Sequence, residues 1–163
     1  MAIREDKHLS MNDDTNETEF PQSLSNEQEV SSQVDRPTIL IVDDNIPIQE
    51  MLYWLLESMG YRAIVSAGGQ AVLTWIDTAL QADDCPGLIL LDLGNPSASG
   101  ADLLHLVRAR WNNTSCALPP IIVLTTSKNL YENLVLVERV LLKPFHVSVL
   151  TALVQEMFSL SSH

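Results

Sequence analysis

The stretch that decides the fold is TILIVDD, residues 38–44. It is apolar from Ile39 to Val42, rich in β-branched side chains, and ends in two aspartates. An uninterrupted apolar run of this length is typical of a strand that is buried on both faces, as in a parallel sheet. The pattern recurs as LILLD at 88–92 and as IIVLT at 121–125. We therefore predict several buried parallel strands, each of which ends at a polar residue.

Segments with helical patterning alternate with these strands. Asn45 is a good capping residue and Pro47 suits a first helical turn, so a helix is predicted from there to Gly60. The other predicted elements are a weaker strand at 62–66, helices at about 70–80 and 101–111, a helical piece near 130–137, a short strand at 140–142 and a helix at about 147–158. Five strands and five helices in alternation predict an α/β fold with one doubly wound, five-stranded parallel sheet and helices on both faces.

Polar side chains gather where the predicted strands end. Asp43 and Asp44 follow the first strand, Asp92 ends the third, Thr125 ends the fourth and Lys143 follows the fifth. Ligands of open parallel sheets bind outside the carboxyl ends of the strands. We therefore expect three carboxylates, one hydroxyl and one ammonium group at the functional edge of the sheet.

These groups have the chemistry that an aspartyl phosphate needs. Three neighbouring aspartates repel one another, and Mg²⁺ relieves that repulsion because it binds carboxylates, waters and a phosphate oxygen. An aspartate can act as a nucleophile toward phosphorus. Mg²⁺, Lys143 and the Thr125 hydroxyl can then each neutralise or bind one oxygen of the transferred group. Read singly, the acids could also be helix-start or turn-forming residues.

The combination of these motifs resembles the signature of response-regulator receiver domains. The resemblance spans roughly residues 38–158. It rests on Asp43-Asp44, on Asp92 with the loop from Asn95-Pro96 to Gly100, on Thr125 after an apolar run, and on Lys143-Pro144-Phe145. It implies a flavodoxin-like sheet with strand order 2-1-3-4-5.

The resemblance also implies a role for each matching residue. Asp92 would be the phosphoacceptor, and Thr125 and Lys143 would bind the phosphoryl group. Asp44 would bind Mg²⁺ directly, Asp43 would act largely through water, and the backbone carbonyl of Gly94 would complete the metal site. A cis peptide is expected before Pro144.

The chain departs from the family pattern mainly after the fourth strand. Val140 stands where the family usually has an aromatic switch residue, and the stretch from Thr125 to Lys143 is a few residues short. We therefore expect an unconventional readout of phosphorylation. An apolar surface for a partner or for self-association as a homodimer is predicted around Leu130, Tyr131, Leu134, Val135, Leu136 and Val137.

Composition and charge exclude several classes of function. Residues 1–36 are polar and carry 9 acidic against 3 basic side chains, which predicts a disordered acidic N-terminal tail before a receiver domain at 37–163. The net charge of −12 argues against nucleic-acid binding. No apolar run could span a membrane and no signal peptide is visible, so a cytoplasmic protein is expected. Cys85 and Cys116 are expected to be reduced and inert.

The predicted function is that of a stand-alone receiver, since only Ser159 to His163 follow the last predicted helix. It would take its phosphoryl group from a sensor histidine kinase or a phosphotransfer protein and act on an unknown downstream protein. It would not be a conventional enzyme, although it would catalyse its own phosphorylation and dephosphorylation. The alternative is a pseudo-receiver that binds proteins without phosphorylation. A haloacid-dehalogenase-type phosphatase fits less well, because that family carries an Asp-x-Asp motif after the first strand.

Overall fold

The computed structural model describes residues 36–94, 99–112, 114–127 and 137–160. The chain divides into two units, Met1–Gln33 and Val34–His163, and every described residue belongs to the second unit. The predicted tail lies outside the described residues except for Arg36, whose guanidinium pairs with Glu57 at 3.0 Å. Within the described part of the chain, no helix has both the length and the apolar character needed to cross a membrane.

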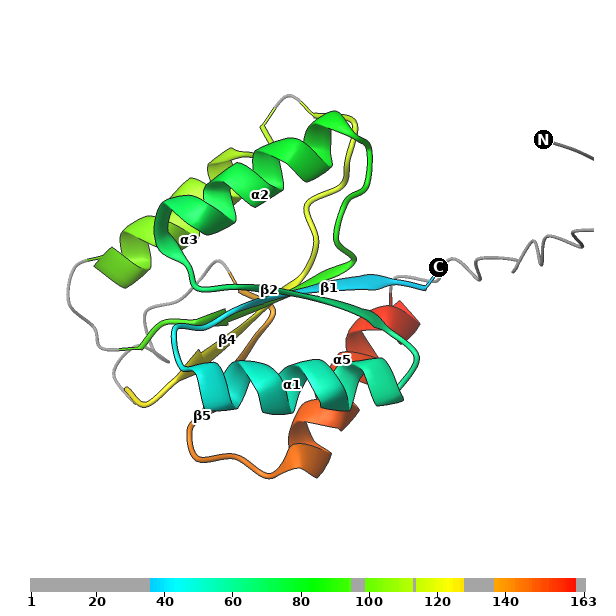
Figure 1. Cartoon of the computed structure of the whole chain (residues 1–163), viewed down its shortest axis with the longest axis vertical. Helices are drawn as coiled ribbons and strands as arrows, with labels where there is room; N and C mark the ends of the chain where they lie inside the picture. Colours follow the sequence, from blue (N-terminus) through cyan, green and yellow to red (C-terminus); the bar gives the residue numbers. More distant parts are fainter. Residues whose placement is uncertain (1–35, 95–98, 113, 128–136, 161–163) are drawn as a thin grey trace, which may run out of the picture. The chain divides into compact units, whose positions relative to one another are not determined.

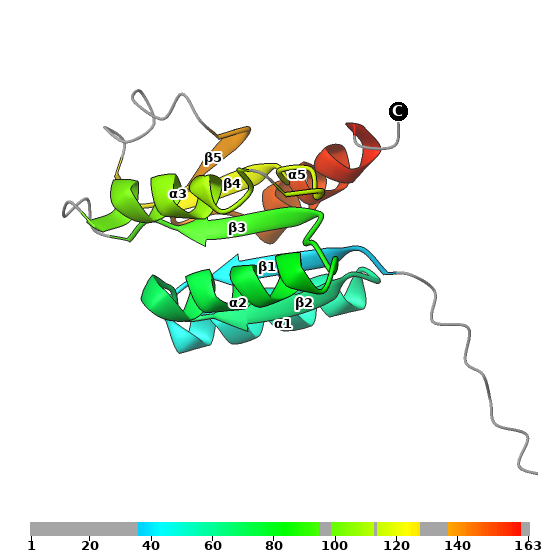
Figure 2. The ribbon, with the colours of Figure 1, turned by 90° about the horizontal axis from the view of Figure 1, so that it is seen from above.

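Five parallel strands form one sheet in the order β2-β1-β3-β4-β5 (Figures 1 and 2). The strands are β1 (Thr38–Val42), β2 (Arg62–Ser66), β3 (Leu88–Asp92), β4 (Ile121–Thr125) and β5 (Arg139–Leu142). This order confirms the doubly wound, flavodoxin-like topology expected from the sequence. The three central strands are buried along their whole length, apart from Asp92, which is half-buried.

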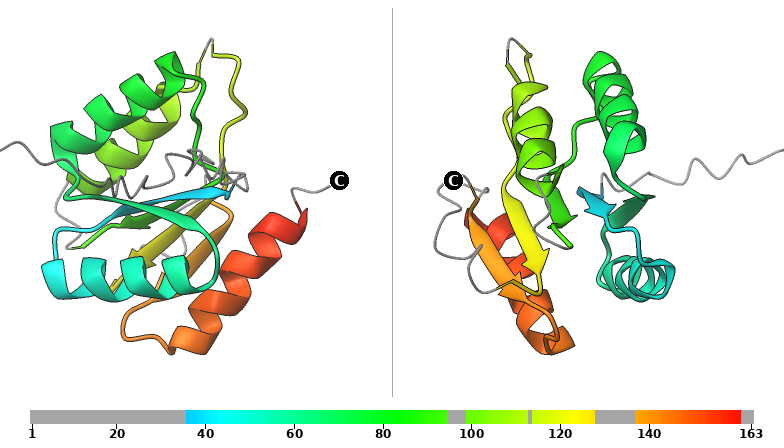
Figure 3. Two further views of the ribbon diagram at one scale, coloured as in Figure 1. Left: turned by 45° about the vertical axis from the view of Figure 1, so that its right-hand side comes forward. Right: turned by 90° about the vertical axis from the view of Figure 1, so that its left-hand side faces the viewer.

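Four described helices cover the two faces of the sheet (Figures 1 and 3). They are α1 (Ile46–Ser58), α2 (Gly69–Gln81), α3 (Ser99–Ala109) and α5 (Val147–Leu160). Their ends differ from the predicted ends by one or two residues. The helical piece predicted near 130–137 lies outside the described residues, except for Val137.

The central strands supply both cores by alternating their side chains. In β1, Ile39 and Ile41 belong to the core shared with α1 and α5, whereas Leu40 and Val42 belong to the core shared with α2 and α3. Successive side chains of a strand point to opposite faces, so a strand covered on both sides needs apolar residues at every position. This is why the deciding stretch is continuously apolar rather than alternating.

Local signals fix the turn that leads from β1 into α1. The Asn45 side chain accepts a hydrogen bond from the Ile48 amide at 3.2 Å and so caps the helix, with Pro47 in the first turn. The helix stops before Gly60, whose φ of +88° is a conformation that glycine adopts without steric cost. Asp43 and Asp44 are thereby held between a buried strand and a capped helix.

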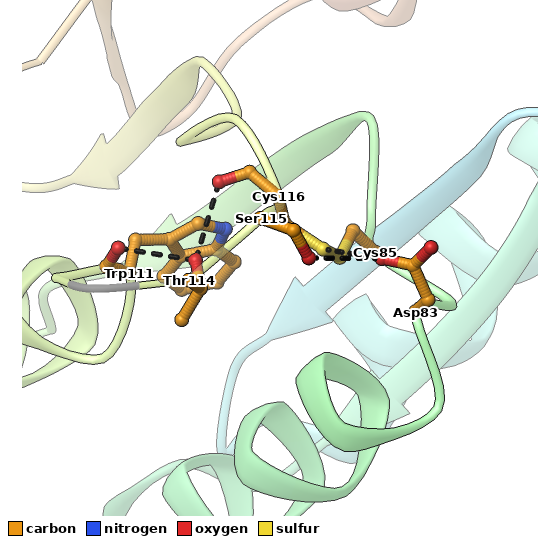
Figure 4. The surroundings of a disulfide bond; sticks show 6 residues. All are labelled: Asp83, Cys85, Trp111, Thr114, Ser115 and Cys116. Carbon is orange, nitrogen blue, oxygen red and sulfur yellow. Dashed lines mark hydrogen bonds between the residues drawn. A yellow bond between two sulfur atoms is a disulfide. The ribbon is translucent and has the colours of Figure 1, made fainter.

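The two cysteines correct one expectation from the sequence, because the structure joins Cys85 and Cys116 in a disulfide (Figure 4). Their Cα atoms lie 6.4 Å apart, within the range that a disulfide spans. Cys85 lies in the connection into β3 and Cys116 in the connection into β4. These strands are neighbours, paired from Ile89 opposite Ile121, so their preceding loops meet although the cysteines are 31 positions apart in the sequence.

Candidate functional site

Asp43 is the most deeply buried of the three aspartates. It is 2% exposed, and its Oδ1 accepts a hydrogen bond from the Asn45 amide at 2.8 Å. The Gln49 side chain donates to its carbonyl oxygen, and its own amide donates to the Ser66 carbonyl at 3.1 Å. Its Oδ2 lies 2.8 Å from the Lys143 Nζ. Asp44, the next residue, is exposed, as a group that binds an incoming ligand must be.

Asp92 ends β3 and has two carboxylate oxygens in different surroundings. Its Oδ2 lies 3.1 Å from the Lys143 Nζ, and its side chain is 9% exposed. Its Oδ1 is buried and has no hydrogen-bond partner within the described part of the chain. Burial raises the pKa of Asp92 above its ordinary value, the Lys143 ammonium offsets this in part, and the charges of Asp43 and Asp44 raise the pKa further.

The three aspartates are close enough to hold one metal ion. Oxygen atoms of Asp43, Asp44 and Asp92 all lie within 4.8 Å of one another. Carboxylate oxygens are the ligands that Mg²⁺ prefers, and the unpartnered Oδ1 of Asp92 is a buried acceptor that such an ion would satisfy. The donor set therefore fits a hard divalent cation. Asp83, Cys85 and Cys116 form a second group of this kind, but a sulfur engaged in a disulfide is not a thiolate ligand.

Lys143 and Thr125 join the aspartates from the two strands beyond β3. The Lys143 side chain is 13% exposed, and its Nζ bridges Asp43 and Asp92. A cis peptide joins it to Pro144, as expected. Thr125 is fully buried; its hydroxyl donates to the Leu93 carbonyl at 3.3 Å and accepts from the Ser127 amide at 3.1 Å. The Lys143 amide donates to the Thr125 carbonyl at 2.8 Å, which ties the two strand ends together.

Gly94 follows Asp92 and lies beside its carboxylate. A Cβ added at Gly94 would lie 3.8 Å from the Asp92 Oδ2, which is an ordinary van der Waals contact. A larger residue is therefore not excluded by that contact, and the role of the Gly94 carbonyl as a metal ligand stays a prediction. Residues 95–98 of the predicted loop lie outside the described residues.

An open pocket of about 580 Å³ leads to the aspartates. It is lined by Asp43, Asp44, Asp92 and Gly94, as expected of residues at this edge of the sheet. Its other walls were not anticipated: they are Val42, Ala67, Gly68, Gly69, Gln70, Leu73, Leu93, Asp102, Leu103 and Leu106. One of these walls could have been predicted from the sequence, because Gly68 and Gly69 follow β2 at the same edge of the sheet.

Val140, the predicted departure from the family pattern, is partly buried. It packs with Val137 against the core beneath α2 and α3 and is paired with Val123 in the sheet. The apolar surface predicted around Leu130 lies outside the described residues apart from Val137.

Comparison with known proteins agrees with this geometry. Residues 39–155 match the response regulator receiver domain. The chain is 35% identical over 96 residues to the phosphate regulon transcriptional regulatory protein PhoB of Pseudomonas aeruginosa, covering 59% of this chain and 38% of PhoB. It is 38% identical over 73 residues to the sensory transduction protein RegX3 of Mycobacterium tuberculosis, covering 45% of this chain and 30% of RegX3. The chain thus spans less than two fifths of these relatives.

Solved structures share the same fold. Chemotaxis protein CheY4 of Vibrio cholerae superposes with a TM-score of 0.57 at 26% identity, covering 75% of this chain and 98% of CheY4. Response regulator TrrA of Thermotoga maritima, solved in complex with Mg(2+)-BeF, superposes with a TM-score of 0.59 at 23% identity and covers 74% of this chain and 98% of TrrA. At that identity the likeness to TrrA concerns the fold alone.

Proposed function

Because this chain belongs to the response regulator receiver domain family, we propose that it accepts a phosphoryl group on Asp92 in a Mg²⁺-dependent reaction. The observation that carries the proposal is the state of the Asp92 carboxylate. One oxygen pairs with Lys143, and the other is buried without a hydrogen-bond partner in the described part of the chain, beside two further aspartates. A carboxylate that is partly desolvated, with one oxygen that accepts no hydrogen bond, is disposed to bind a cation and to react.

Each residue then has a defined task in the transfer. A carboxylate oxygen of Asp92 attacks the phosphorus of a phosphohistidine, the phosphorus–nitrogen bond breaks, and the imidazole leaves with its electron pair. Mg²⁺ held by Asp43, Asp44 and Asp92 would supply the positive charge that lets the acids and the phosphoryl group approach. The Gly94 carbonyl is the further ligand that we assign to it.

Lys143 and Thr125 would bind the product. The Lys143 Nζ pairs with Asp43 and Asp92 before the reaction, so it needs only a small movement to pair with a phosphoryl oxygen. The Thr125 hydroxyl donates to the Leu93 carbonyl and would have to turn toward the phosphoryl group. Its rotation would alter the contact between β4 and the loop after β3, which offers a route from phosphorylation to the surface near β5.

The phosphoryl donor we propose is a sensor histidine kinase or a histidine phosphotransfer protein, and the output is a phosphorylation-dependent interaction with another protein or a relay step. Turnover is limited to the chain's own phosphorylation and dephosphorylation. The stand-alone architecture and the homodimer stay predictions of the sequence. The main rival is a pseudo-receiver that binds proteins without phosphate, which the replacement of a large switch residue by Val140 favours.

Intact mass spectrometry separates the two functions. The protein is incubated with Mg²⁺ and a small acyl phosphate, beside Asp92→Asn and a sample that contains a chelator. We expect a gain of one phosphoryl group that requires Mg²⁺ and is absent from Asp92→Asn. Asp102→Asn is the matched control, because Asp102 lines the same pocket outside the cluster of three aspartates. A folded protein that gains no phosphoryl group would support the pseudo-receiver.

A further inference from the structure

A second group of reactive side chains lies at the amino ends of β3 and β4. We call Asp83, Cys85, Ser115 and Cys116 the cysteine cluster (Figure 4). Asp92 and Thr125 lie at the carboxyl ends of the same two strands, so the cluster is at the opposite end of the sheet from the phosphorylation site. The cluster is therefore a separate chemical site, and its chemistry is that of sulfur.

The cores on both faces of the sheet are built from apolar side chains without help from the disulfide. Cys116 packs only at the margin of the core beneath α2 and α3, and Cys85 precedes the first buried residues of β3. Both cysteines are half-buried, and Asp83, Ser115 and Ala117 beside them are exposed. Part of each cysteine is thus exposed to solvent in the folded protein, and thiol–disulfide exchange requires access of this kind.

A carboxylate lies directly beside one of the sulfur atoms. The Asp83 Oδ1 is 3.6 Å from the Cys116 Sγ and accepts a hydrogen bond from the Ser115 hydroxyl at 3.3 Å. The sulfur of a disulfide carries no proton, so this contact becomes a hydrogen bond only when Cys116 is a thiol. A negative charge at that distance disfavours a thiolate on Cys116 and repels an approaching thiolate, and both effects slow exchange.

We propose that Cys85 and Cys116 are a reversible modification site that exchanges with low-molecular-weight thiols and disulfides, and that Asp83 restrains the exchange. In the oxidising direction, two protein thiols lose two protons and two electrons to one disulfide of the glutathione type, which becomes two thiols. In the reducing direction, a thiolate attacks one protein sulfur to form a mixed disulfide, and the other protein sulfur leaves as a thiolate. A second thiolate attacks the small-molecule sulfur of the mixed disulfide, which releases a small disulfide, and the two protein thiolates take up protons. This inference does not depend on the phosphorylation of Asp92.

The bond determines whether the segment that bears Asp92 is covalently closed. The closed ring runs from Cys85 through β3 and α3 to Cys116. It includes Asp92, Leu93, Gly94 and Asp102, which form one side of the pocket at the phosphorylation site. The disulfide thus lies at the amino end of the strand whose carboxyl end carries Asp92.

The test is a redox titration of the full chain. The protein is equilibrated in buffers of varied ratio of reduced to oxidised glutathione, trapped with an alkylating reagent and weighed intact. We expect an all-or-none change between no alkyl group and two, reversible from both directions, with unchanged far-ultraviolet circular dichroism. A disulfide that is reduced only in denaturant would overturn the proposal. So would two thiols that stay free at every ratio, or a bond formed between two chains.

Two matched variants test the restraint by Asp83. Asp83 has a φ of +57°, which asparagine adopts readily, so Asp83→Asn removes the charge and keeps the local backbone. We expect this variant to be reduced by glutathione several-fold faster than the wild type. Asp84→Asn is the control, because Asp84 pairs with Arg62 at 2.9 Å instead. Equal reduction rates in the two variants would overturn the role of Asp83, while the titration alone decides the exchange.

Discussion

Different kinds of bond hold the two ends of β3 and β4, non-covalent at the carboxyl ends and covalent at the amino ends. At the carboxyl ends, Asp92 and Thr125 are held by an ion pair to Lys143 and a hydrogen bond to the Leu93 carbonyl. At the amino ends, the loops that precede the strands are joined by a covalent bond. Contacts of the first kind can be exchanged for contacts with an ion or a phosphoryl group, whereas the second kind changes only by a redox reaction. If both proposals hold, one pair of strands would receive two inputs of different chemistry.

We expect the largest loss of stability from a substitution at the carboxyl ends of these strands. Lys143→Met would leave the fully buried Asp43 side chain without its cation, and removing one partner of a buried ion pair costs about 3–5 kcal/mol. We expect a loss of that size in the free energy of unfolding, measured by urea denaturation without Mg²⁺. Arg139→Met, on the strand that precedes Lys143, is the control. Its exposed pair with Glu156 should contribute about 0–1 kcal/mol, so equal losses would contradict the importance assigned to Lys143.

At the amino end, the disulfide should stabilise the oxidised protein by limiting its unfolded chain. For a sequence separation of 31 residues, the chain-entropy relation gives about 3–4 kcal/mol. The double variant Cys85→Ser with Cys116→Ser should lose about that much relative to the oxidised wild type in urea denaturation. The reduced wild type should have the same free energy of unfolding as the double variant. Equal free energies of unfolding for the reduced and oxidised proteins would show that the disulfide does not stabilise the fold.

Mg²⁺ should raise the free energy of unfolding by binding at the carboxyl ends of the strands. A substitution in the cysteine cluster should not change this gain. At a concentration one hundred times its dissociation constant, a ligand that binds only the folded state adds about 2.7 kcal/mol to the free energy of unfolding. We expect Asp44→Asn to remove most of this gain, because Asp44 is an exposed member of the metal cluster. Asp83→Asn should keep it. A Mg²⁺ effect on unfolding that survives in Asp44→Asn would contradict the assigned ligand set.

The smallest expected effect is a pH dependence at the carboxyl end. The pKa of Asp92 is raised in the folded protein, mainly by burial, so the folded state holds this proton more tightly than the unfolded chain does. The contribution to stability is therefore complete at low pH and is lost as pH rises from the ordinary value of 3.8 through the folded pKa. Without Mg²⁺, urea denaturation across this range should show a decline in the wild type that Asp92→Asn lacks. If the free energy of unfolding changed with pH equally in the wild type and in Asp92→Asn, the prediction would be wrong.

Much of this arrangement could be predicted from the sequence. The apolar runs at 38–42, 88–91 and 121–124 indicated strands covered on both sides, and the polar residues after them indicated one functional edge. The positions of Asp43, Asp92 and Lys143 were expected because the ends of neighbouring parallel strands meet. The sequence could not show that Lys143 bridges two of the acids, since that depends on side-chain directions after the cis peptide.

The disulfide was missed for a different reason. Cys85 and Cys116 have no metal or redox spacing in the sequence, so no local motif predicts the bond. The predicted strand order already placed the third and fourth strands side by side, so the loops before them had to be neighbours. That topology was sufficient to place Cys85 near Cys116, although not to show that they bond. The walls of the pocket formed by α3 were missed because they depend on how the helix packs.

The pairing of Asp43 with Lys143 joins residues one hundred positions apart. A chain emerging from the ribosome therefore carries its acidic cluster long before it carries the cation that balances it. Contacts so distant in sequence form only after most of the intervening chain has been ordered, because closing a long loop is costly until other contacts support it. A partly synthesised chain would therefore carry the aspartates without the lysine that balances their charge. Under the proposed function, competence to accept a phosphoryl group would thus come only with the last segments of the domain.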